Sequence, residues 1–386
     1  MPTRVAVIGA TGSIGAQALE IIGRFPERFE LVGAVAGRRV AALREALVPF
    51  PSATAVVIDP DIPVPQGVAV GIEAACQMAS APDVDVVLIG GGGAGALLPT
   101  LAACRSGRLV AIATKEVLVM AGELVTETAR EHGARIVPVD SEHSAIWQCL
   151  RGERPESVRR LILTASGGAL RSLPLRELSG VTPDQALAHP NWRMGPKVTV
   201  DTATMINKGL EVIEAHFLFD IPYERIEVLI HPQSAIHSAV EFCDGTMIAQ
   251  LGIADMRAPI ALALSDGVRL PGVVKPLQLA ELGRLDFEAV DPVRYPALRV
   301  VRAAGVRGGA APAVMNAANE VAVAAFLDGK LPFMEIATLV ERVTSSFRPP
   351  ATLRLEQLLE ADRWGRDQAQ ALVGQSASPA PGPVPV

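Results

Sequence analysis

Short apolar runs alternate with amphipathic stretches from the start of the chain to Val139. Each run is bounded by glycine or polar residues and is too short for a helix, which is typical of strands buried in a parallel sheet. The helical periodicity between successive runs predicts βαβ units, and therefore a doubly wound α/β fold. The predicted strands are Arg4–Ile8, Leu31–Ala36, Ala55–Ile58, Val84–Ile89, Leu109–Ala113 and Ile136–Val139.

Beyond Val139 the pattern changes twice. Ser157–Thr164 begins a second α/β domain, with further strands predicted at Ile226–Ile230 and Thr246–Gly252. A connector punctuated by Gly and Pro follows, and helical periodicity from Ala311 then predicts a small helical domain. The Ala/Ser/Pro-rich end is expected to be disordered. The predicted boundaries are 1–150 for the first domain, 151–265 for the second, 266–310 for the connector, 311–370 for the helical domain and 371–386 for the tail.

Residues 189–211 (HPNWRMGPKVTVDTATMINKGLE) combine a turn-prone loop with a predicted helix. We expect a β-like run at Lys197–Asp201 and a helix that begins near Asp201 or Thr202, because both are good N-cap residues. Spacing alone favours a solvated helix face with a Lys–Glu pair. The Trp and His in the loop just upstream favour function instead, because loops on rigid scaffolds often carry it. The residues that share the helix face are Asn207, Lys208 and Glu211.

The composition is that of a globular protein with an acidic balance. Hydrophobic residues make up 49% of the 386 residues and charged residues 20%, and the net charge is −6. This balance argues against a surface for nucleic acid or anionic membranes, although it allows a local basic pocket. The 4 cysteines are scattered without a C-x-x-C pair. They predict reduced thiols in a cytoplasmic protein, with neither a zinc site nor a disulfide framework.

One stretch raises the question of a membrane span. Val86–Cys104 contains no charged residue and is long enough to cross a bilayer. Its run Gly90–Gly93 and Pro99 favour a strand, a glycine loop and a helix instead. No signal peptide is predicted, because a strand-like run begins at Arg4. We therefore expect a soluble protein.

The loop after the first strand reads GATGSIG (Gly9–Gly15) and leads into a helical pattern. Strand, glycine loop and helix is the order that a dinucleotide site requires, although the usual spacing is G-x-G-x-x-G. The backbone N–H groups of such a loop and the helix N-terminus can bind a pyrophosphate. A tight structural turn is the alternative, but the position at the start of an alternating β/α chain favours cofactor binding.

The second strand ends in Gly37-Arg38-Arg39. Enzymes that use NAD usually have an acidic residue here for the ribose 2′-hydroxyl, whereas arginines suit the 2′-phosphate of NADP. The sequence therefore predicts NADPH rather than NADH, with two solvated arginines at a helix start as the alternative. The loops Gly90–Ala96 and Thr114–Glu116 should lie at the same carboxyl edge, where doubly wound sheets bind ligands.

Polar residues also follow the last strand of this sheet, in the run Asp140-Ser141-Glu142-His143. In an extended tip, alternate residues point the same way, so Asp140 and Glu142 can converge on one point. Two carboxylates suit Mg²⁺ or Mn²⁺. An acidic turn with a helix cap is the alternative. Further along, Ala165–Gly168 is a small loop that could wrap a phosphate.

Taken together, the motifs resemble those of the 1-deoxy-D-xylulose 5-phosphate reductoisomerase family. They follow the family's order over nearly the whole chain except the tail, and this order is far more specific than any single motif. The matching segments are GATGSIG (9–15), LLPTLAA (97–103), KE (115–116), DSEH (140–143), SGG (166–168), HPNWRMGPK (189–197), MINKGLE (205–211), HPQSAIHS (231–238), DMRAPI (255–260) and NAANEVAVAAFL (316–327).

The resemblance implies a Rossmann-like NADPH-binding domain, an α/β catalytic domain and a C-terminal α-helical domain, in a V-shaped homodimer. It implies conversion of 1-deoxy-D-xylulose 5-phosphate to 2-C-methyl-D-erythritol 4-phosphate in the non-mevalonate isoprenoid pathway. The skeleton would rearrange by retro-aldol and aldol steps, and NADPH would then reduce the aldehyde intermediate. A divalent metal ion, Mg²⁺ or Mn²⁺, is also implied.

The family's site residues carry over to this sequence position by position. Asp140, Glu142 and Glu211 match the metal ligands, and Lys115 and His189 join them as catalytic residues. The positions that match substrate contacts are Lys115, Ser141, Glu142, Ser166, His189, Trp192, Thr202, Asn207, Lys208 and Glu211. The positions that match NADPH contacts are Thr11, Gly12, Ser13, Ile14, Gly37, Arg38, Arg39, Thr114, Glu116 and Gly195.

Two positions depart from the family pattern, since Thr114 replaces a common Asn and Thr202 a common Ser. Both keep a polar group, so activity is still expected. We also predict that Ser166–Pro196 is a lid with Trp192 as its packing group; a Trp permanently packed on the surface is the alternative. Competing functions are another NADP oxidoreductase with a catalytic Cys, a metal-dependent phosphosugar isomerase or aldolase, and an NADP sensor without catalysis.

Overall fold

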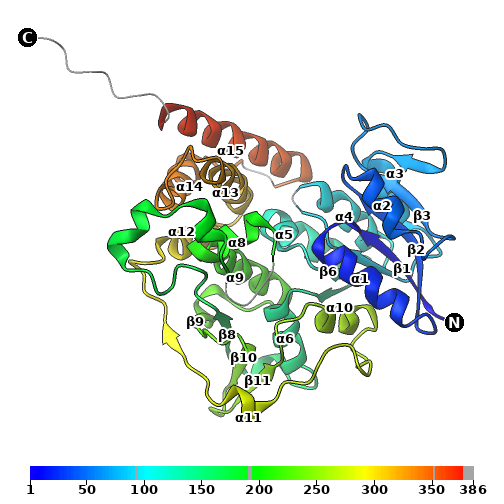
Figure 1. Ribbon diagram of the computed structural model, residues 1–386, viewed down its shortest axis with the longest axis horizontal. Helices are drawn as coiled ribbons and strands as arrows, with labels where there is room; N and C mark the ends of the chain where they lie inside the picture. The colour runs from blue at the N-terminus through cyan, green and yellow to red at the C-terminus, as the bar shows by residue number, and fades with distance from the viewer. Residues whose placement is uncertain (93, 190–193, 351–352, 377–386) are drawn as a thin grey trace, which may run out of the picture. The chain divides into compact units, whose positions relative to one another are not determined.

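The computed structural model describes residues 1–92, 94–189, 194–350 and 353–376. The chain divides into two compact units. The first unit consists of residues 1–164 and 214–287, and the second of residues 165–213 and 288–386. Each unit therefore combines segments that are distant in the sequence. Figure 1 shows the elements of both units in chain order by colour.

The first unit contains a 7-stranded sheet with the order β4-β3-β2-β1-β5-β6-β7. Every neighbouring pair is parallel. The order reverses direction at β1, as in a doubly wound sheet, and this confirms the predicted fold class. The strands are β1 Thr3–Ile8, β2 Phe29–Ala36, β3 Thr54–Val57, β4 Val68–Val70, β5 Val86–Ile89, β6 Leu109–Ile112 and β7 Arg135–Pro138.

The core of this sheet is apolar on both faces, because helices cover both of them. Val5, Val7 and Leu88 have no exposed surface. The covering helices are α1 Ser13–Arg24, α2 Val40–Ala46, α3 Ile72–Ser80, α4 Leu97–Arg105 and α5 Lys115–Glu131. Helix α6 Ser141–Cys149 follows β7 and packs mainly on the second sheet of this unit.

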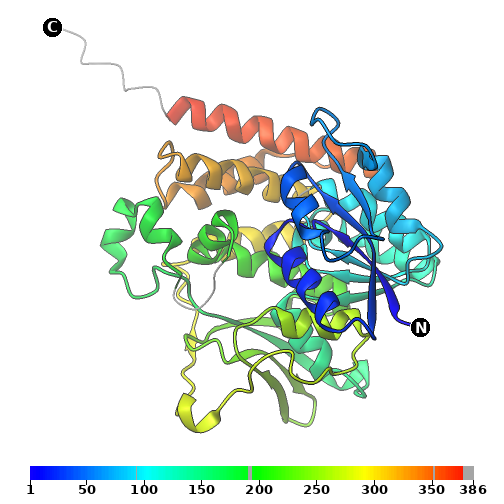
Figure 2. The same cartoon turned by 45° about the vertical axis from the view of Figure 1, so that its right-hand side comes forward.

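A later helix, α10 Arg257–Leu264, also belongs to this core. Figures 1 and 2 show α10 beside α1, and Ile260 and Leu264 join the same hydrophobic cluster as Leu19 and Ile22. The first unit thus extends beyond the segment 1–150 that the sequence pattern delimits.

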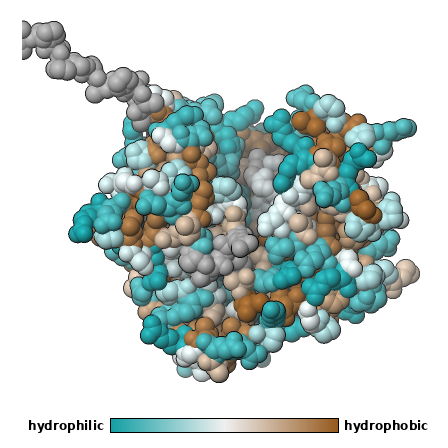
Figure 3. Space-filling model, viewed as in Figure 1, coloured by the Kyte–Doolittle hydropathy of each residue, from teal (hydrophilic) through white to brown (hydrophobic). Residues whose placement is uncertain are grey.

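The first unit also contains a second sheet, in which the strands lie in the order β11-β10-β8-β9 and β10 pairs antiparallel with both β11 and β8. Its outer strand β11 carries the exposed apolar residues Met247, Ile248 and Leu251. Elsewhere, the face drawn in Figure 3 is largely hydrophilic, with separate hydrophobic patches. The elements are β8 Val158–Ala165, β9 Ile226–Ile230, β10 Ile236–Phe242, β11 Met247–Leu251 and the short α11 Leu279–Leu282.

The second unit is mainly helical. Helix α13 lies at its centre and packs against α14 and α15 (Figure 1). Helix α15 continues to Ser376, so the stretch 371–376 is helical where we expected the disordered tail to begin. The elements are α7 Pro183–Leu187, α8 Pro196–Thr204, the first part of α9 Ile206–Phe219, β12 Glu288–Ala289, α12 Pro296–Arg307, α13 Ala311–Leu327, α14 Glu335–Ser346 and α15 Leu355–Ser376.

The β-like run predicted at Lys197–Asp201 is wrong, because these residues belong to α8. Pro196 occupies the first helical position, where its fixed φ favours a helix. The β-branched residues suggested a strand, but Val200 is fully buried on the helix, and this packing outweighs the propensity. The predicted helix start near Asp201 or Thr202 is also wrong: Met205 adopts a left-handed φ of 64° and separates α8 from α9.

The membrane question is settled for the described part of the chain. Val86–Cys104 divides into β5, a glycine-rich loop and α4. Among the described residues, no helix combines the length and the apolar character that crossing a bilayer requires.

Candidate active site

The glycine loop after β1 is shaped by one close contact. Gly9 has a φ of +86°, and a Cβ atom on it would lie 2.4 Å from the nitrogen of Gly91. The N–H groups of Gly9 and Ala10 donate to the carbonyl of Val35, at 2.9 and 2.8 Å. Helix α1 then begins at Ser13, and Gly12 at its N-cap supplies no side-chain cap. The N-terminus of α1 therefore keeps backbone N–H groups available for an anion.

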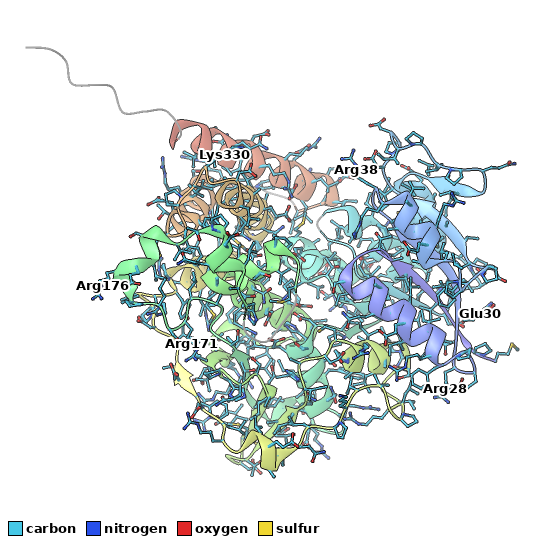
Figure 4. The ribbon with its side chains drawn as sticks, in the orientation of Figure 1. Arg28, Glu30, Arg38, Arg171, Arg176 and Lys330 are labelled. Atoms are coloured by element: carbon cyan, nitrogen blue, oxygen red, sulfur yellow. The ribbon has the colours of Figure 1, made fainter. Side chains whose placement is uncertain are left out.

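Two arginines flank this loop at the end of β2. Arg39 Nη2 donates to the carbonyl of Thr11 at 2.5 Å, which joins the loops after β1 and β2. Arg38 Nε lies 2.9 Å from Asp59 Oδ2, and 73% of the Arg38 side chain is exposed. Figure 4 shows Arg38 at the surface of the first unit. Two guanidinium groups therefore lie at the edge where a nucleotide 2′-phosphate would bind.

Helix α5 begins after β6, with Thr114 as its N-cap residue. The Thr114 hydroxyl donates to the carbonyl of Gly91, and so holds the second glycine loop. Glu116 lies in the first turn of α5. Lys115 is 9% exposed, and its Nζ lies 2.9 Å from Asp140 Oδ2.

The geometry expected for Asp140 and Glu142 needs a correction. They do not lie on an extended tip: Asp140 is the N-cap residue of α6, and its Oδ1 accepts from the Ser141 N–H at 3.1 Å. Glu142 follows in the first helical turn and accepts from the Ser141 hydroxyl at 2.5 Å. Asp140 and Glu142 still converge, since each offers a carboxylate oxygen within 4.8 Å of the other.

The Asp140 carboxylate is held in its ionised form. Burial by itself raises its pKa, but the Lys115 ammonium and the hydrogen bond from His143 outweigh burial and lower the pKa below its ordinary value. An ionised, largely buried carboxylate beside a second one is the donor set that a hard divalent cation requires. The residues present therefore fit a divalent metal ion.

Two buried side chains, His143 and Glu214, form a cluster with Asp140. His143 Nδ1 lies 3.4 Å from Asp140 Oδ2 and 3.3 Å from Glu214 Oε2. His143 and Glu214 have no exposed surface. Their ligand atoms and that of Asp140 lie within 4.8 Å of one another. Our sequence reasoning missed Glu214, although its position three residues after Glu211 places it on the same helix face.

The second unit holds the remaining candidates. The predicted face of α9 is present but buried, so the solvated alternative is wrong: Lys208 is 4% exposed and Glu211 1%. Asn207 Nδ2 donates to Glu211 Oε1 at 2.6 Å, and Lys208 Nζ donates to Glu211 Oε2. Two donors therefore fix the Glu211 carboxylate.

A short loop faces helix α8 in the same unit. Ser166 Oγ accepts from the Gly168 N–H at 3.1 Å and lies 3.1 Å from His189 Nε2. Burial lowers the pKa of His189 below its ordinary value. Thr202 lies on α8 with its hydroxyl donating to Val198 at 2.8 Å, and Gly195 is the N-cap residue of α8. Trp192 lies outside the described residues.

The structure thus gathers the candidates into two groups. At the carboxyl edge of the parallel sheet, nucleotide-loop residues and an ionised carboxylate lie after β1, β2, β6 and β7. In the second unit, small polar side chains, a lysine and a carboxylate line α8, α9 and one loop. The first group is Thr11–Ile14, Gly37–Arg39, Thr114–Glu116 and Asp140–Glu142, and the second is Ser166, His189, Gly195, Thr202, Asn207, Lys208 and Glu211.

A doubly wound sheet with a glycine loop, paired arginines and a carboxylate cluster defines a nucleotide-dependent enzyme of the α/β class. Three family models match the chain. They describe the 1-deoxy-D-xylulose 5-phosphate reductoisomerase at residues 5–122, its C-terminal domain at 136–219 and the DXP reductoisomerase C-terminal domain at 251–368.

Relatives with this name match almost end to end. The protein of Symbiobacterium thermophilum is 49% identical over 384 residues, in an alignment that covers 96% of this chain and 98% of the relative. That of Pelodictyon phaeoclathratiforme is 47% identical over 378 residues, in an alignment that covers 96% of this chain and 99% of the relative. The chain therefore belongs to the 1-deoxy-D-xylulose 5-phosphate reductoisomerase family, as its motifs predicted.

Solved structures of this family agree with this assignment. A reductoisomerase from Zymomonas mobilis in complex with NADPH is 43% identical, with a TM-score of 0.89 over 97% of this chain and 99% of that one. A second, in complex with NADPH, fosmidomycin and magnesium, is 37% identical, with a TM-score of 0.90 over 96% and 98%. The predicted fold and enzyme class are confirmed.

Proposed function

We propose that this chain converts 1-deoxy-D-xylulose 5-phosphate to 2-C-methyl-D-erythritol 4-phosphate, with NADPH and a divalent metal ion, Mg²⁺ or Mn²⁺. Family membership and the complexes of the solved relatives support the reaction and its cofactors. The residue roles rest on the geometry of this chain. The observation that best supports these residue roles is the continuity of helix α9.

Glu211 and Glu214 lie on the same helix, α9. Glu214 on this helix lies against His143, which lies against Asp140. Glu211 precedes Glu214 by three residues, and residues at this spacing are neighbours on one helix face. Glu211 is therefore the third carboxylate that, with Asp140 and Glu142, would hold the metal ion. When bound, such an ion polarises substrate oxygens as a Lewis acid.

Lys115 and His189 supply groups that hold or move protons. Lys115 Nζ is nearly buried beside Asp140, so it can place positive charge against an oxygen that gains negative charge. Burial keeps His189 neutral at pH 7, and its Nε2 lies at the Ser166 hydroxyl. A neutral imidazole in this position can accept or return a proton while it orients the serine. Ser141, which donates to Glu142, orients that carboxylate.

The substrate phosphate would bind in the second unit. Its donors are hydroxyls, an amide and an ammonium, which together suit a phosphate dianion. Remote binding energy of this kind can drive closure over the reacting carbons, which is the role we propose for Ser166–Pro196 and Trp192. The residues are Ser166, Thr202, Asn207 and Lys208.

NADPH would bind at the carboxyl edge of the parallel sheet and supply hydride. Its pyrophosphate would lie at the N-terminus of α1, and its 2′-phosphate between Arg38 and Arg39. The remaining contacts of the nucleotide are proposed by position in the family motif. They are Thr11, Gly12, Ser13, Ile14, Gly37, Thr114, Glu116 and Gly195.

The assay that tests this function uses the full chain with NADPH, Mg²⁺ and 1-deoxy-D-xylulose 5-phosphate. Nicotinamide absorbance should fall only when all three are present, with 2-C-methyl-D-erythritol 4-phosphate as the product. A rearranged phosphosugar formed without loss of absorbance would indicate a phosphosugar isomerase instead. Glu241→Gln is a suitable control in this assay, because Glu241 is buried and paired with Arg159 and Arg160 but lies outside the proposed site.

The chain is also proposed to form a homodimer through strand β11. This strand lies at the edge of its sheet, and Met247, Ile248 and Leu251 are 52%, 41% and 38% exposed. An exposed apolar edge strand is a template for pairing with a second copy. Replacing Met247 and Ile248 with Lys should convert a dimer to a monomer in sedimentation, and an unchanged mass would contradict this interface.

A cytoplasmic location is proposed as well. The cysteines Cys76, Cys104, Cys149 and Cys243 are all free thiols, which suits a reducing compartment. Localisation of a fluorescent fusion would test this point.

A further inference from the structure

A buried carboxylate on α8 has a partner far away in the sequence. Asp201 is 1% exposed, and we considered it from the sequence only as a helix cap. Its Oδ2 lies 3.0 Å from Lys197 Nζ on the same helix. Its Oδ1 accepts a hydrogen bond from Asn319 Nδ2 at 2.8 Å. Asn319 lies on α13, so this bond joins α8 to the C-terminal helices of the second unit.

Helix α13 is a firm support for such a bond. A Cβ atom on Gly365 of α15 would lie 2.9 Å from the carbonyl oxygen of Val314, which shows how closely α15 packs on α13. Arg366 of α15 also pairs with Glu320 of α13, at 2.7 Å. Asn319 itself has no exposed surface. Burying a carboxylate and an amide is costly compared with apolar residues of similar size, so their benefit lies in fixing one arrangement of the two helices.

The arrangement of α8 matters because the proposed phosphate loop lies directly on it. A Cβ atom on Gly168 would lie 2.7 Å from Ala203 Cα and 2.8 Å from the Thr202 carbonyl oxygen. Gly168 in turn donates its N–H to the Ser166 hydroxyl. Thr202 and Ala203 directly follow Asp201. A shift of α8 would therefore move Thr202 and Ser166 together.

A second bond ties the same loop to the C-terminal part of the unit. The hydroxyl of Tyr295, at the start of α12, donates to the carbonyl of Gly167 at 2.9 Å. Tyr295 is 4% exposed. The loop and its supporting helix are thus each held by one buried polar bond from the helical segment beyond residue 288.

We propose that Asn319 is a positioning residue for the substrate phosphate. It fixes α8 through Asp201, and α8 carries Thr202 and seats the Ser166–Gly168 loop. Asn319 does not touch the substrate itself. This inference rests on the proposed function, because it takes Ser166 and Thr202 as the phosphate contacts.

The test replaces Asn319 with Leu, which has a similar size but no donor. The KM for 1-deoxy-D-xylulose 5-phosphate should rise about tenfold, equivalent to ~1.4 kcal/mol, with a smaller change in kcat. The inhibition constant of inorganic phosphate against this substrate should rise by a similar factor, while the Kd of NADPH stays unchanged. A general loss of structure would weaken NADPH binding as well.

Asn316→Leu is the matched control. Asn316 lies one turn earlier on α13, is equally buried, and donates to Glu320 instead of Asp201. It should lower the melting temperature comparably but leave KM and phosphate inhibition near wild type. Equal effects of the two substitutions on KM would overturn the positioning role.

Two further variants keep the test decisive if Asn319→Leu does not fold. Asn319→Asp places a carboxylate against Asp201 and should raise KM. The double variant Asp201→Asn with Asn319→Asp exchanges the two side chains and should bring KM back to within about threefold of wild type. Failure of this rescue would count against the proposal. Ser166→Ala separates the positioning role from the phosphate site. If Ser166→Ala leaves phosphate inhibition unchanged, the proposed phosphate site is wrong. If Ser166→Ala weakens phosphate inhibition but Asn319→Leu does not, only the positioning role is refuted.

Discussion

We propose that Glu211 has both a structural and a catalytic role, which one substitution can separate. Its carboxylate is 1% exposed and accepts from Asn207 and from Lys208, which is itself 4% exposed. In Glu211→Gln the amide oxygen can still accept from Asn207, but the attraction to the Lys208 ammonium is lost. Breaking one buried ion pair costs about 3–5 kcal/mol, so the free energy of unfolding should fall by roughly 3 kcal/mol.

The activity of this variant should fall far more than its stability explains. At a temperature where the variant is still folded, turnover should be nearly abolished, because the proposed metal site loses one of its three carboxylates. NADPH should bind with normal affinity, since its proposed site lies at the ends of β1 and β2.

Urea titration and nicotinamide absorbance measure the two effects independently. Glu241→Gln should lose less stability and keep its turnover, because Glu241 pairs with the more exposed Arg159 and Arg160 away from the site. Adding Lys208→Met to Glu211→Gln should recover part of the stability without restoring turnover. Wild-type activity of Glu211→Gln across a range of Mg²⁺ concentrations would refute the ligand role.

Three other predictions follow from the site. Replacing Arg38 and Arg39 with Ala should weaken NADPH binding strongly and leave NADH binding almost unchanged, because each charge-assisted hydrogen bond contributes about 1.5–3 kcal/mol; equal losses for both nucleotides would argue against the 2′-phosphate site. The folded-state pKa of His189 is lowered by burial, so its contribution to stability is complete above its ordinary pKa of about 6.5 and is lost as pH falls through the lowered value. His189→Asn should therefore flatten the pH dependence of the melting temperature in this acidic range, and an unchanged profile would contradict the assignment. Trp192→Ala should cut turnover sharply but spare metal and NADPH binding, and phosphorylated substrate analogue with metal should protect the wild-type segment Ser166–Pro196 from proteolysis; equally slow cleavage with and without ligand would exclude a lid.

The parallel sheet was predictable because its strands are continuous apolar runs between glycine loops. The short strand β4, Val68–Val70, was not, since it is three residues long and mostly exposed. Helix α8 was misread because its β-branched residues mimic a strand, whereas Pro196 and the burial of Val200 decide for a helix. Local pattern therefore identified the elements with strong periodicity and failed where packing overrides propensity.

The candidate site was likewise only partly predictable from local pattern. Motif order predicted Asp140, Glu142 and Glu211 as metal ligands, but neither the cap geometry of Asp140 nor the buried His143–Glu214 contact follows from local spacing. Asn319 lies in a run of small residues on α13, and only the fold shows that it reaches Asp201. Polar contacts between distant segments depend on how the helices pack, which periodicity does not encode.

The most direct test of the account is the position of the metal ion. Crystals of the full chain grown with Mn²⁺ and NADPH should show one anomalous peak, with oxygen ligands from Asp140, Glu142 and Glu211. A peak coordinated instead by Asp140, His143 and Glu214, or one that excludes Glu211, would contradict the proposed site.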